Sequence, residues 1–316
     1  MMQISKEKPK SSPNNRLSLA IVRSELLCFL KYQKQRITDT YHYPLTKKLK
    51  TFLTHTPPAE LPEEDRKQML AYMRFHLAKN FNYPFAVKYL FRRTKVYFDK
   101  GNNLHYIITA ENRKLYFRRG ASPKSICNSY NYLCMEQDLE SPHYYCFDGE
   151  PQENTILADI GAAEGNFSLQ FIDRMKKVYL FEANQEWIEA LEATFQPWKD
   201  KVVIVNKYVS NKNDDDCLAL DTYFKDKEKP TLLKADVEGA EKDVLEGLSE
   251  TMNGQQLKDI LICTYHQKDD ERVLSELLQA KGYATKPSPK FMLFDNDLMS
   301  KEPPYDFRHG LLHASK

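Results

Sequence analysis

The stretch Thr155–Gln170 constrains the fold of this chain more than any other part of its sequence. It begins as an apolar run, stops at Asp159, and continues through a turn with Gly161 and Gly165 into a helical pattern. A strand, a glycine-bearing loop and a helix in this order are typical of cofactor-binding α/β sheets. The loop departs from the dinucleotide-binding pattern, because Ala163 stands at the second glycine position and Asp159 would face the phosphates. A cationic cofactor, S-adenosylmethionine, fits this loop better.

A second acid favours the same interpretation. Residues 177–182 predict the next strand, and Glu182 at its end follows Asp159 by 23 residues. In doubly wound sheets this position holds the group that accepts hydrogen bonds from the ribose hydroxyls. Either acid alone could be an ordinary helix N-cap. At this spacing the two together indicate a cofactor site.

Composition and patterning predict a folded protein with no membrane-spanning segment. A chain of 316 residues with 41% hydrophobic residues can bury the cores of about two domains. Arg23 and Glu25 interrupt the longest apolar stretch, residues 17–30, so we expect no membrane span. The polar N-terminus lacks the pattern of a signal peptide, and we expect a cytoplasmic protein. The six cysteines show no Cys-x-x-Cys spacing, which argues against a structural zinc site and against a disulfide framework.

The charge is distributed unevenly along the chain. Residues 1–150 hold 25 Lys and Arg against 14 Asp and Glu, whereas residues 151–316 hold 21 against 30. A basic first half predicts an anionic partner, such as a nucleotide-sugar, a charged glycan, a membrane surface or RNA. The alternative is that the two halves attract each other across their interface. The sequence leaves both interpretations open.

The chain divides into three regions. Residues 1–15 are polar and rich in Pro and Ser, which predicts disorder. Residues 16–150 predict a mixed α and β region, a candidate acceptor-binding or interface domain, and residues 151–316 predict the cofactor-binding domain. Within the second region, periodicity predicts helices over 17–35, 47–52 and from 61 onward, a β-meander over 94–119, and a helix over 125–137.

Arg118 and Arg119 are the candidate acceptor-binding residues. They end the predicted meander, where cations alternate with tyrosines. Such a surface could bind a phosphate or a sugar, but cations that protect an edge strand give the same pattern.

Beyond Glu182 strands and helices alternate, which predicts a largely parallel sheet covered by helices. Together with the run before Asp159, seven strands are expected. The other six are expected at 177–182, 201–205, 231–236, 260–265, 291–294 and 310–314.

Catalytic candidates follow two of these strands. Ligands of such sheets bind beyond the carboxyl ends of the strands, where Asp236, Glu238 and His266 stand. Methyl transfer to a hydroxyl requires alignment of the acceptor and removal of its proton. We favour His266 as the general base. The alternatives are a divalent cation held by Asp236 and His266, with Glu238 as a further candidate ligand, and Asp236 itself as the base.

Several strings of the second half carry a family resemblance, above all Leu233–Glu241 (Leu-Lys-Ala-Asp-Val-Glu-Gly-Ala-Glu), together with Asp159–Gly165, Phe181–Ala183 and Leu220–Asp221. Residues 150–316 resemble the FkbM family of S-adenosylmethionine-dependent methyltransferases. The resemblance implies a class I methyltransferase fold with a seven-stranded doubly wound sheet, and O-methylation of a sugar or a glycosylated metabolite, often in surface polysaccharide synthesis. It implies cofactor contacts at Asp159, Gly161 and Glu182. Further candidate cofactor-binding residues in the same two loops are Ala162, Glu164, Gly165 and Ala183. Asp236 and Glu238 fall at the signature acids of the family.

Two other functions remain open at this point. The basic first half could serve an RNA methyltransferase, although the chain has no Asn/Asp-Pro-Pro-Tyr motif and no RNA-binding module signature. The fold could also be a non-catalytic binding domain, against which the intact acids weigh. The acceptor and the oligomeric state are not predicted.

Overall fold

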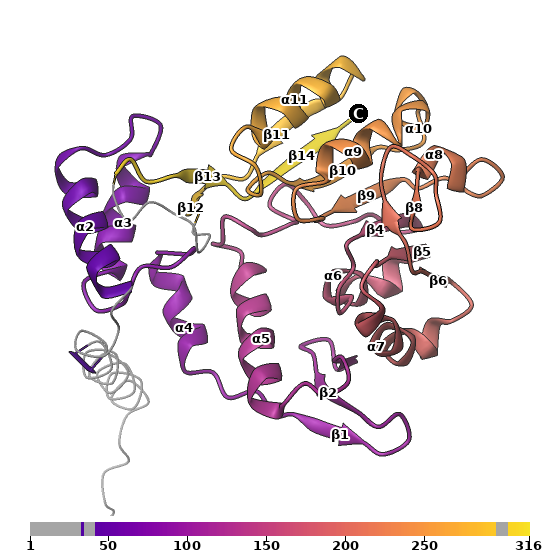
Figure 1. Ribbon diagram of the computed structural model, residues 1–316, viewed down its shortest axis with the longest axis horizontal. Coiled ribbons are helices and arrows are strands. Elements are labelled where there is room, and N and C mark those ends of the chain that lie inside the picture. The colour runs from indigo at the N-terminus through magenta and orange to yellow at the C-terminus, as the bar shows by residue number, and fades with distance from the viewer. Residues whose placement is uncertain (1–32, 35–41, 295–302) are drawn as a thin grey trace, which may run out of the picture. The chain divides into compact units, whose positions relative to one another are not determined.

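The computed structural model describes residues 33–34, 42–294 and 303–316 (Figure 1). They form two compact units, one with the described residues up to Pro84 and 303–305, the other with Phe85–Phe294 and Asp306–Lys316. The disorder predicted for residues 1–15 lies outside the described residues, as does nearly all of the helix predicted over 17–35. The boundary expected after residue 150 lies inside the second unit. None of the described helices is long and apolar enough to cross a membrane.

Among the residues that the structure describes, the first unit includes the helices α2 (His42–His55) and α3 (Glu63–Tyr72), which lie side by side in Figure 1. Leu45, Leu49 and Leu53 recur every fourth residue, so α2 buries one apolar stripe. α3 contributes the buried Met69 to the core of the same unit.

A seven-stranded sheet organises the second unit. Its strands, in spatial order, are β11 (Ala284–Pro287), β14 (Leu311–Ser315), β10 (Asp259–Cys263), β9 (Leu232–Ala235), β4 (Thr155–Ile160), β5 (Met175–Phe181) and β6 (Val202–Val205). β14 runs antiparallel to both neighbours, and the pairs from β10 to β6 are parallel. Every residue of β4 and β9 is buried, as expected for central strands covered on both faces.

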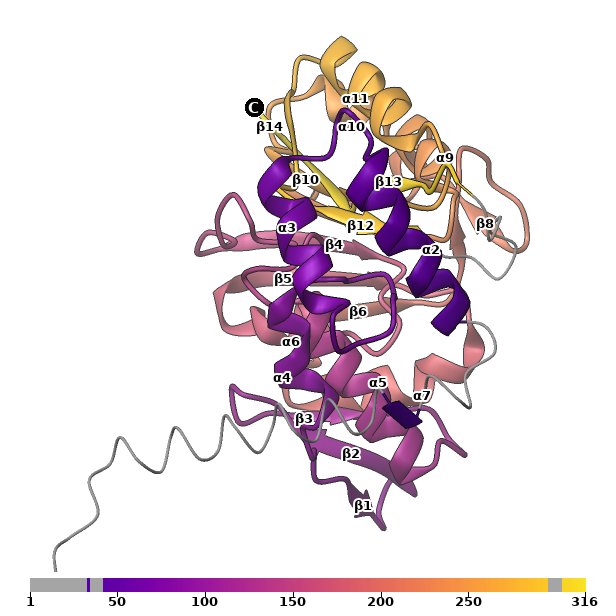
Figure 2. The ribbon, with the colours of Figure 1, turned by 90° about the vertical axis from the view of Figure 1, so that its left-hand side faces the viewer.

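Helices cover both faces of this sheet (Figures 1 and 2). Side chains of α5 (Pro123–Glu136), α6 (Asn166–Gln170) and α7 (Gln185–Phe195) share one buried cluster with Leu157 and Cys263. Side chains of α8 (Leu220–Tyr223), α9 (Glu241–Glu246), α10 (Ser249–Asn253) and α11 (Asp270–Ala280) share the other, with Ala158 and Ile262. Successive residues of a strand point to opposite faces, so each strand contributes side chains to both clusters. The short turns η2 (Ile172–Arg174) and η3 (Gln196–Trp198) follow α6 and α7. The predicted seven-stranded doubly wound α/β fold is confirmed.

The segment before β4 contributes a meander and α5. After η1 (Pro84–Ala86) and α4 (Val87–Leu90), the strands β1 (Tyr97–Asp99), β2 (Leu104–Ile108) and β3 (Lys114–Tyr116) pair antiparallel, as predicted. The backbone N–H of Tyr116 donates to Thr194 Oγ1 of α7 at 3.0 Å in a buried position. The meander is therefore packed on the helix layer of the sheet.

Two further ladders lie outside the main sheet. β7 (Tyr208–Val209) pairs with β8 (Cys217–Leu218), and β12 (Phe291–Leu293) pairs with β13 (Phe307–His309). The prediction that residues 291–294 form a strand of the main sheet was therefore wrong, because β11 takes that place. β11 lies at the edge and alternates between exposed and half-buried residues, so it has no apolar run for a sequence pattern to detect.

We predict that Thr194→Val destabilises the second unit. The substitution keeps the side-chain shape but leaves the buried N–H of Tyr116 without its acceptor, which costs roughly 1–3 kcal/mol. The free energy of unfolding in urea measures the effect. Thr222→Val is the matched control, because Thr222 is exposed and its substitution should change stability by less than about 0.5 kcal/mol. Equal values for the two variants would contradict the docking role.

Candidate active site

The candidate site residues meet at one edge of the sheet. β4, β5, β9 and β10 run parallel, so their carboxyl ends lie at the same edge. The residues that follow them begin with Gly161, Glu182, Asp236 and Thr264. The candidate residues follow different strands in the sequence. The parallel direction of these strands places them at one edge of the sheet.

The glycine loop after β4 requires its two glycines. Gly161 has φ +72°, and a Cβ there would lie 1.9 Å from the carbonyl oxygen of Asp236. Gly165 has φ +80°, and a Cβ there would lie 2.6 Å from the ring of Phe195. Ala162 is buried and its N–H donates to Phe181 O at 3.1 Å. The loop therefore lies directly against the end of β9, with no space for a side chain at its first glycine.

Glu182 organises the neighbouring loop. Its Oε2 accepts from the N–H of Ala163 at 2.8 Å, and its Oε1 accepts from the N–H of Asn184 at 2.7 Å. Asn206 Nδ2 donates to the carbonyl oxygen of Ala183 at 3.0 Å. An ionised carboxylate offers about four acceptor positions, so Glu182 retains capacity for two more donors. This arrangement suits the predicted ribose contact.

Asp159 has a different environment from the one expected of a direct cofactor contact. Lys234 Nζ lies 3.0 Å from Asp159 Oδ1 and also donates to Gly161 O at 2.8 Å. Ser168 Oγ donates to Asp159 Oδ2 at 2.7 Å. Asp159 and Lys234 are neighbours in register and both are buried. The carboxylate is thereby engaged with protein groups, and its predicted contact with a cofactor stays a prediction.

Glu164 is a buried acid in the same loop. Burial raises the pKa of Glu164 to about 7. The charges of Lys234 and Asp159 act on it in opposite directions. Near neutral pH the carboxyl group therefore exists in both protonation states, and a cation bound beside it would favour the ionised one.

Asp236 is the centre of the polar network at the end of β9. Tyr145 donates to its Oδ2 at 2.9 Å, and Tyr265 donates to its Oδ1 at 3.3 Å. Burial would raise the pKa of Asp236, but the charge of Lys234 and the hydrogen bond from Tyr145 outweigh it and hold the pKa below its ordinary value. Asp236 is therefore an anion in the absence of any ligand.

His266 is oriented by a second acid. Its Nδ1 lies 2.8 Å from Oε1 of Glu241, a residue with no exposed surface. Its Nε2 lies 3.6 Å from Asp236 Oδ1 and 3.5 Å from Glu238 Oε2. Burial lowers the pKa of His266, but the hydrogen bond and charge of Glu241 outweigh burial and raise it above its ordinary value. The three predicted catalytic residues are thus brought together, with Nε2 facing the two acids.

Glu238 shows backbone strain at this point. It has φ +54° and a side chain that is 92% exposed, so nothing in its own packing requires this conformation. Its neighbour Gly239 has φ +101°, which completes the tight turn from β9 into α9.

Sequence reasoning missed several residues of the site. Tyr145, Tyr265 and Glu241 contact the predicted residues directly, and Glu136 at the end of α5 lies near them. Burial raises the pKa of Glu136, and the charges of Asp236 and Glu164 raise it further. The aromatic run before β4 was a detectable signal for Tyr145, whereas nothing local marks Glu136 as a site residue.

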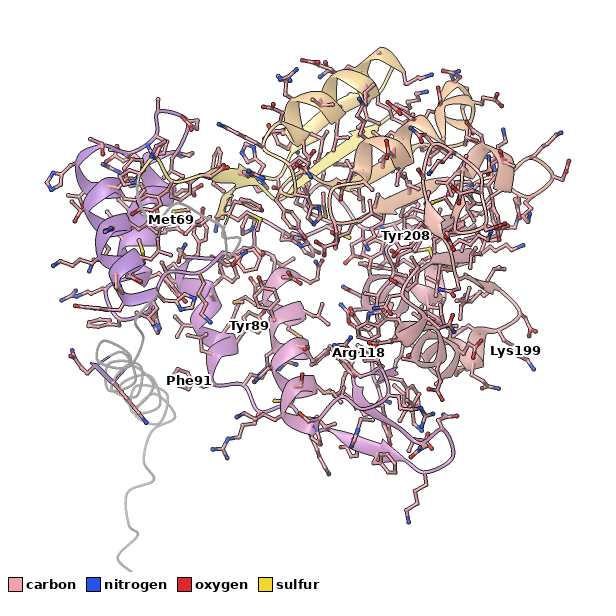
Figure 3. All side chains as sticks on the ribbon, viewed as in Figure 1. Met69, Tyr89, Phe91, Arg118, Lys199 and Tyr208 are labelled. Atoms are coloured by element: carbon pink, nitrogen blue, oxygen red, sulfur yellow. The ribbon has the colours of Figure 1, made fainter. Side chains whose placement is uncertain are left out.

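Arg118 and Arg119 already have acidic partners on α7 (Arg118 is labelled in Figure 3). Arg118 NH1 lies 2.6 Å from Glu186 Oε2, and Arg119 forms an ion pair with Glu189. These ion pairs are contacts between the basic first half and the acidic second half of the chain, which the sequence left open as an alternative to an anionic partner. Exposed ion pairs contribute little, so an anionic acceptor could still compete for either arginine. Their role in acceptor binding stays a prediction.

Two of the expected cation ligands, Asp236 and His266, lie close together, and the third acid beside them is Glu241 instead of the expected Glu238. One ligand atom each from Asp236, Glu241 and His266 lies within 4.8 Å of the other two. Glu241 already engages His266 Nδ1, so a cation would have to use Nε2.

Comparison with known proteins gives a partial match. Residues 209–284 match the family model of the Methyltransferase FkbM domain, which confirms the family resemblance and supports classing the chain with the S-adenosylmethionine-dependent methyltransferases. No curated protein matches the chain.

Among solved structures, a methyltransferase FkbM from Methylobacillus flagellatus KT is 14% identical, with 61% of this chain and 55% of that chain covered and a TM-score of 0.41. This chain thus spans about half the length of that protein. A precorrin-6y C5,15-methyltransferase from Geobacter metallireducens GS-15 is 13% identical, with coverage of 56% and 88% and a TM-score of 0.39. TrmK of M. capricolum, solved with S-adenosyl-homocysteine, is 16% identical, with coverage of 52% and 64% and a TM-score of 0.35.

We predict that Glu164→Gln stabilises the free protein at pH 8 but not at pH 5. Because the folded-state pKa of Glu164 is raised to about 7, the folded protein binds more protons than the unfolded chain between its ordinary pKa and 7. The contribution of Glu164 to the free energy of unfolding therefore decreases as the pH rises from the ordinary pKa of this side chain to about 7. At pH 8 the variant should gain roughly 1–3 kcal/mol in free energy of unfolding. A gain that is the same at both pH values would contradict the raised pKa.

Proposed function

We propose, from the match of residues 209–284 to the FkbM methyltransferase domain and from the geometry of the strand ends, that this chain is an S-adenosylmethionine-dependent O-methyltransferase. Its acceptor is a hydroxyl group of a sugar or glycan. The carbohydrate is what the family resemblance implies.

One observation carries the proposal of a hydroxyl acceptor. A buried acid, Glu241, holds an imidazole whose Nε2 points to the carboxyl edge of the sheet. The same edge carries Asp236, and its carbonyl oxygen lies against Gly161 of the glycine loop. A group able to accept a proton therefore lies beside the loop that would hold the methyl donor. This is the geometry that an O-methyltransferase needs.

The residues present fit S-adenosylmethionine. Glu182 can accept the two ribose hydroxyls, and the left-handed backbone of Gly161 holds the glycine loop directly against the end of β9. The buried carboxyl of Glu164 suits a cation. When bound, the cofactor supplies a methyl group on a positively charged sulfur, which is the electrophile of the transfer.

The chain's own residues then handle the acceptor proton. His266 Nε2 takes the proton from the hydroxyl as the nucleophile forms. Glu241 stabilises the resulting imidazolium through its hydrogen bond to Nδ1, and Asp236 and Glu238 add negative charge on the opposite side. Tyr145 and Tyr265 hold the Asp236 carboxylate in place.

Glu182→Ala tests the cofactor assignment. We expect the affinity for S-adenosylmethionine, measured by calorimetry, to fall about tenfold or more, because hydrogen bonds to a charged acceptor contribute roughly 1.5–3 kcal/mol each. Glu186→Ala is the matched control, since Glu186 is an exposed acid four residues away. Among the described residues, its carboxylate pairs with Arg118. Undiminished binding by Glu182→Ala would mean that the ribose contact is misassigned, and a wild-type chain that fails to bind the cofactor would indicate a non-catalytic domain.

His266→Ala and Glu241→Gln test the proton-transfer assignment. Turnover on a carbohydrate acceptor should fall roughly 10²–10⁴-fold in the first variant, with cofactor affinity unchanged. His309→Gln is the control, because His309 pairs with Glu271 at 2.9 Å in a similar dyad outside the site. Normal turnover of His266→Ala would leave Asp236 as the base. A wild-type chain that methylates RNA, with strongly salt-dependent binding, and leaves carbohydrate untouched would replace the proposed acceptor.

A further inference from the structure

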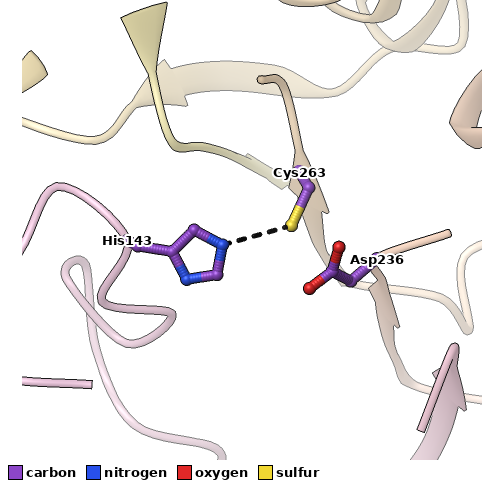
Figure 4. A group of neighbouring side chains, drawn as sticks. All are labelled: His143, Asp236 and Cys263. Atoms are coloured by element: carbon purple, nitrogen blue, oxygen red, sulfur yellow. Dashed lines mark hydrogen bonds between the residues drawn. The ribbon is translucent and has the colours of Figure 1, made fainter. Parts of the chain in front are cut away.

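A second group of potential metal ligands shares Asp236 with the candidate active site. Figure 4 draws this group. It consists of His143, Asp236 and Cys263, and one ligand atom from each lies within 4.8 Å of the other two. His143 Nε2 and Cys263 Sγ are 3.7 Å apart. Figure 4 shows the imidazole, the thiol and the carboxylate directed toward one another.

The register of the sheet explains two of these positions. Ile262 of β10 pairs with Ala235 of β9, so the next residues along the two parallel strands, Cys263 and Asp236, are also neighbours. His143 comes from the segment between α5 and β4. Its ring contacts those of Tyr145 and Tyr265, with centroids 5.3 and 5.2 Å away.

We propose that His143 Nε2, Cys263 Sγ and a carboxylate oxygen of Asp236 form a zinc site. Sulfur, imidazole nitrogen and carboxylate oxygen are the three donor types that zinc takes from proteins, and three protein ligands leave one position open. A thiolate among the donors disfavours magnesium and calcium. The site is distinct from the one expected at Asp236 and His266, with which it shares only the aspartate.

The distances agree with a tetrahedral ion. Zinc–sulfur and zinc–nitrogen bonds of about 2.3 and 2.1 Å place the two ligand atoms about 3.6 Å apart at a tetrahedral angle. His143 Nε2 and Cys263 Sγ are already 3.7 Å apart. Tyr145 Oη lies 3.7 Å from the same sulfur and 2.9 Å from Asp236 Oδ2, so its hydroxyl group stands beside the open position.

The charges also agree with a divalent ion. Binding releases the thiol proton of Cys263 to solvent, since a coordinating thiol is deprotonated. The thiolate and Asp236 then carry two negative charges, which one Zn²⁺ neutralises, while His143 binds as neutral imidazole. Lys234 of β9 already has its own partner in Asp159.

Burial separates this group from an ordinary surface cluster. His143 is 3% exposed and Cys263 is fully buried, whereas the side chain of Asp236 is 23% exposed. An ion can therefore enter from the side of Asp236 and be enclosed by the other two ligands. Bound there, it would connect the ends of β9 and β10 next to the acceptor, a role in the reaction that rests on the proposed function.

The test is metal binding by the full untagged chain, which does not depend on methyl transfer. We expect about one zinc per chain after purification without chelator. We also expect the metal-free protein to bind cobalt(II) with a thiolate-to-cobalt charge-transfer band. Cys263→Ser should abolish the band, and His143→Gln should weaken cobalt binding by roughly tenfold or more, because loss of even an outer partner of a ligand costs 10–100-fold. Cys146→Ser is the matched control, since Cys146 is also buried, at 6% exposed, and lies outside the cluster.

Three outcomes would overturn the proposal. Wild-type protein that binds neither zinc nor cobalt has a thiol–imidazole hydrogen bond here and no metal site. Cobalt binding without a charge-transfer band would place the ion at Asp236, Glu241 and His266. A charge-transfer band that persists in Cys263→Ser but is lost in Cys146→Ser would mean that the thiolate ligand is Cys146. If a variant fails to fold, zinc and cobalt binding by the wild-type chain still tests the proposed site. Normal zinc binding with no methyl transfer would leave this site standing while the proposed function fails.

Discussion

The buried ion pair between Lys234 and Asp159 is the interaction on which the carboxyl edge of the sheet depends. The two residues are neighbours in register on β9 and β4, and Lys234 also donates to the carbonyl oxygen of Gly161. Removing one member of such a pair leaves an uncompensated buried charge, which typically costs several kcal/mol. The pair therefore fixes the start of the glycine loop against the end of β9. Because of it, Asp236 lies beside the loop that we assign to the cofactor.

The polar network around Asp236 extends from this pair into the segment that precedes the sheet. Tyr145 comes from that segment and donates to Asp236, and His143 reaches Cys263 from the same stretch. Residues 85–150 are thus part of the unit that contains the sheet, and they supply side chains to its functional edge. This explains why the resemblance to a methyltransferase domain, which covers only the second half, leaves the site incomplete.

Part of the uneven charge of the chain is used within the second unit. Arg113, Arg118 and Arg119 of the meander region pair with Asp173, Glu186 and Glu189. Mutual attraction between a basic and an acidic part of the chain therefore accounts for these arginines without an anionic ligand. Each pair is at least partly exposed and contributes modestly by itself. Their combined effect is to orient the meander on α7, where the hydrogen bond from Tyr116 to Thr194 is also found.

The sequence by itself determined the strand–loop–helix at Thr155–Gln170, six of the seven strands of the sheet and the positions of Glu182, Asp236 and His266. It could do so because periodicity shows where strands end and ligands bind beyond those ends. Only the tertiary structure decided which side chains meet there. Tyr145 and Asp236 are 91 residues apart in the chain, and His143 and Cys263 are 120 apart. The partner of Asp159 and the choice of β11 over β12 as a strand of the sheet likewise depend on strand register and edge pairing. A local pattern records none of these, since each contact exists only after distant segments have packed together.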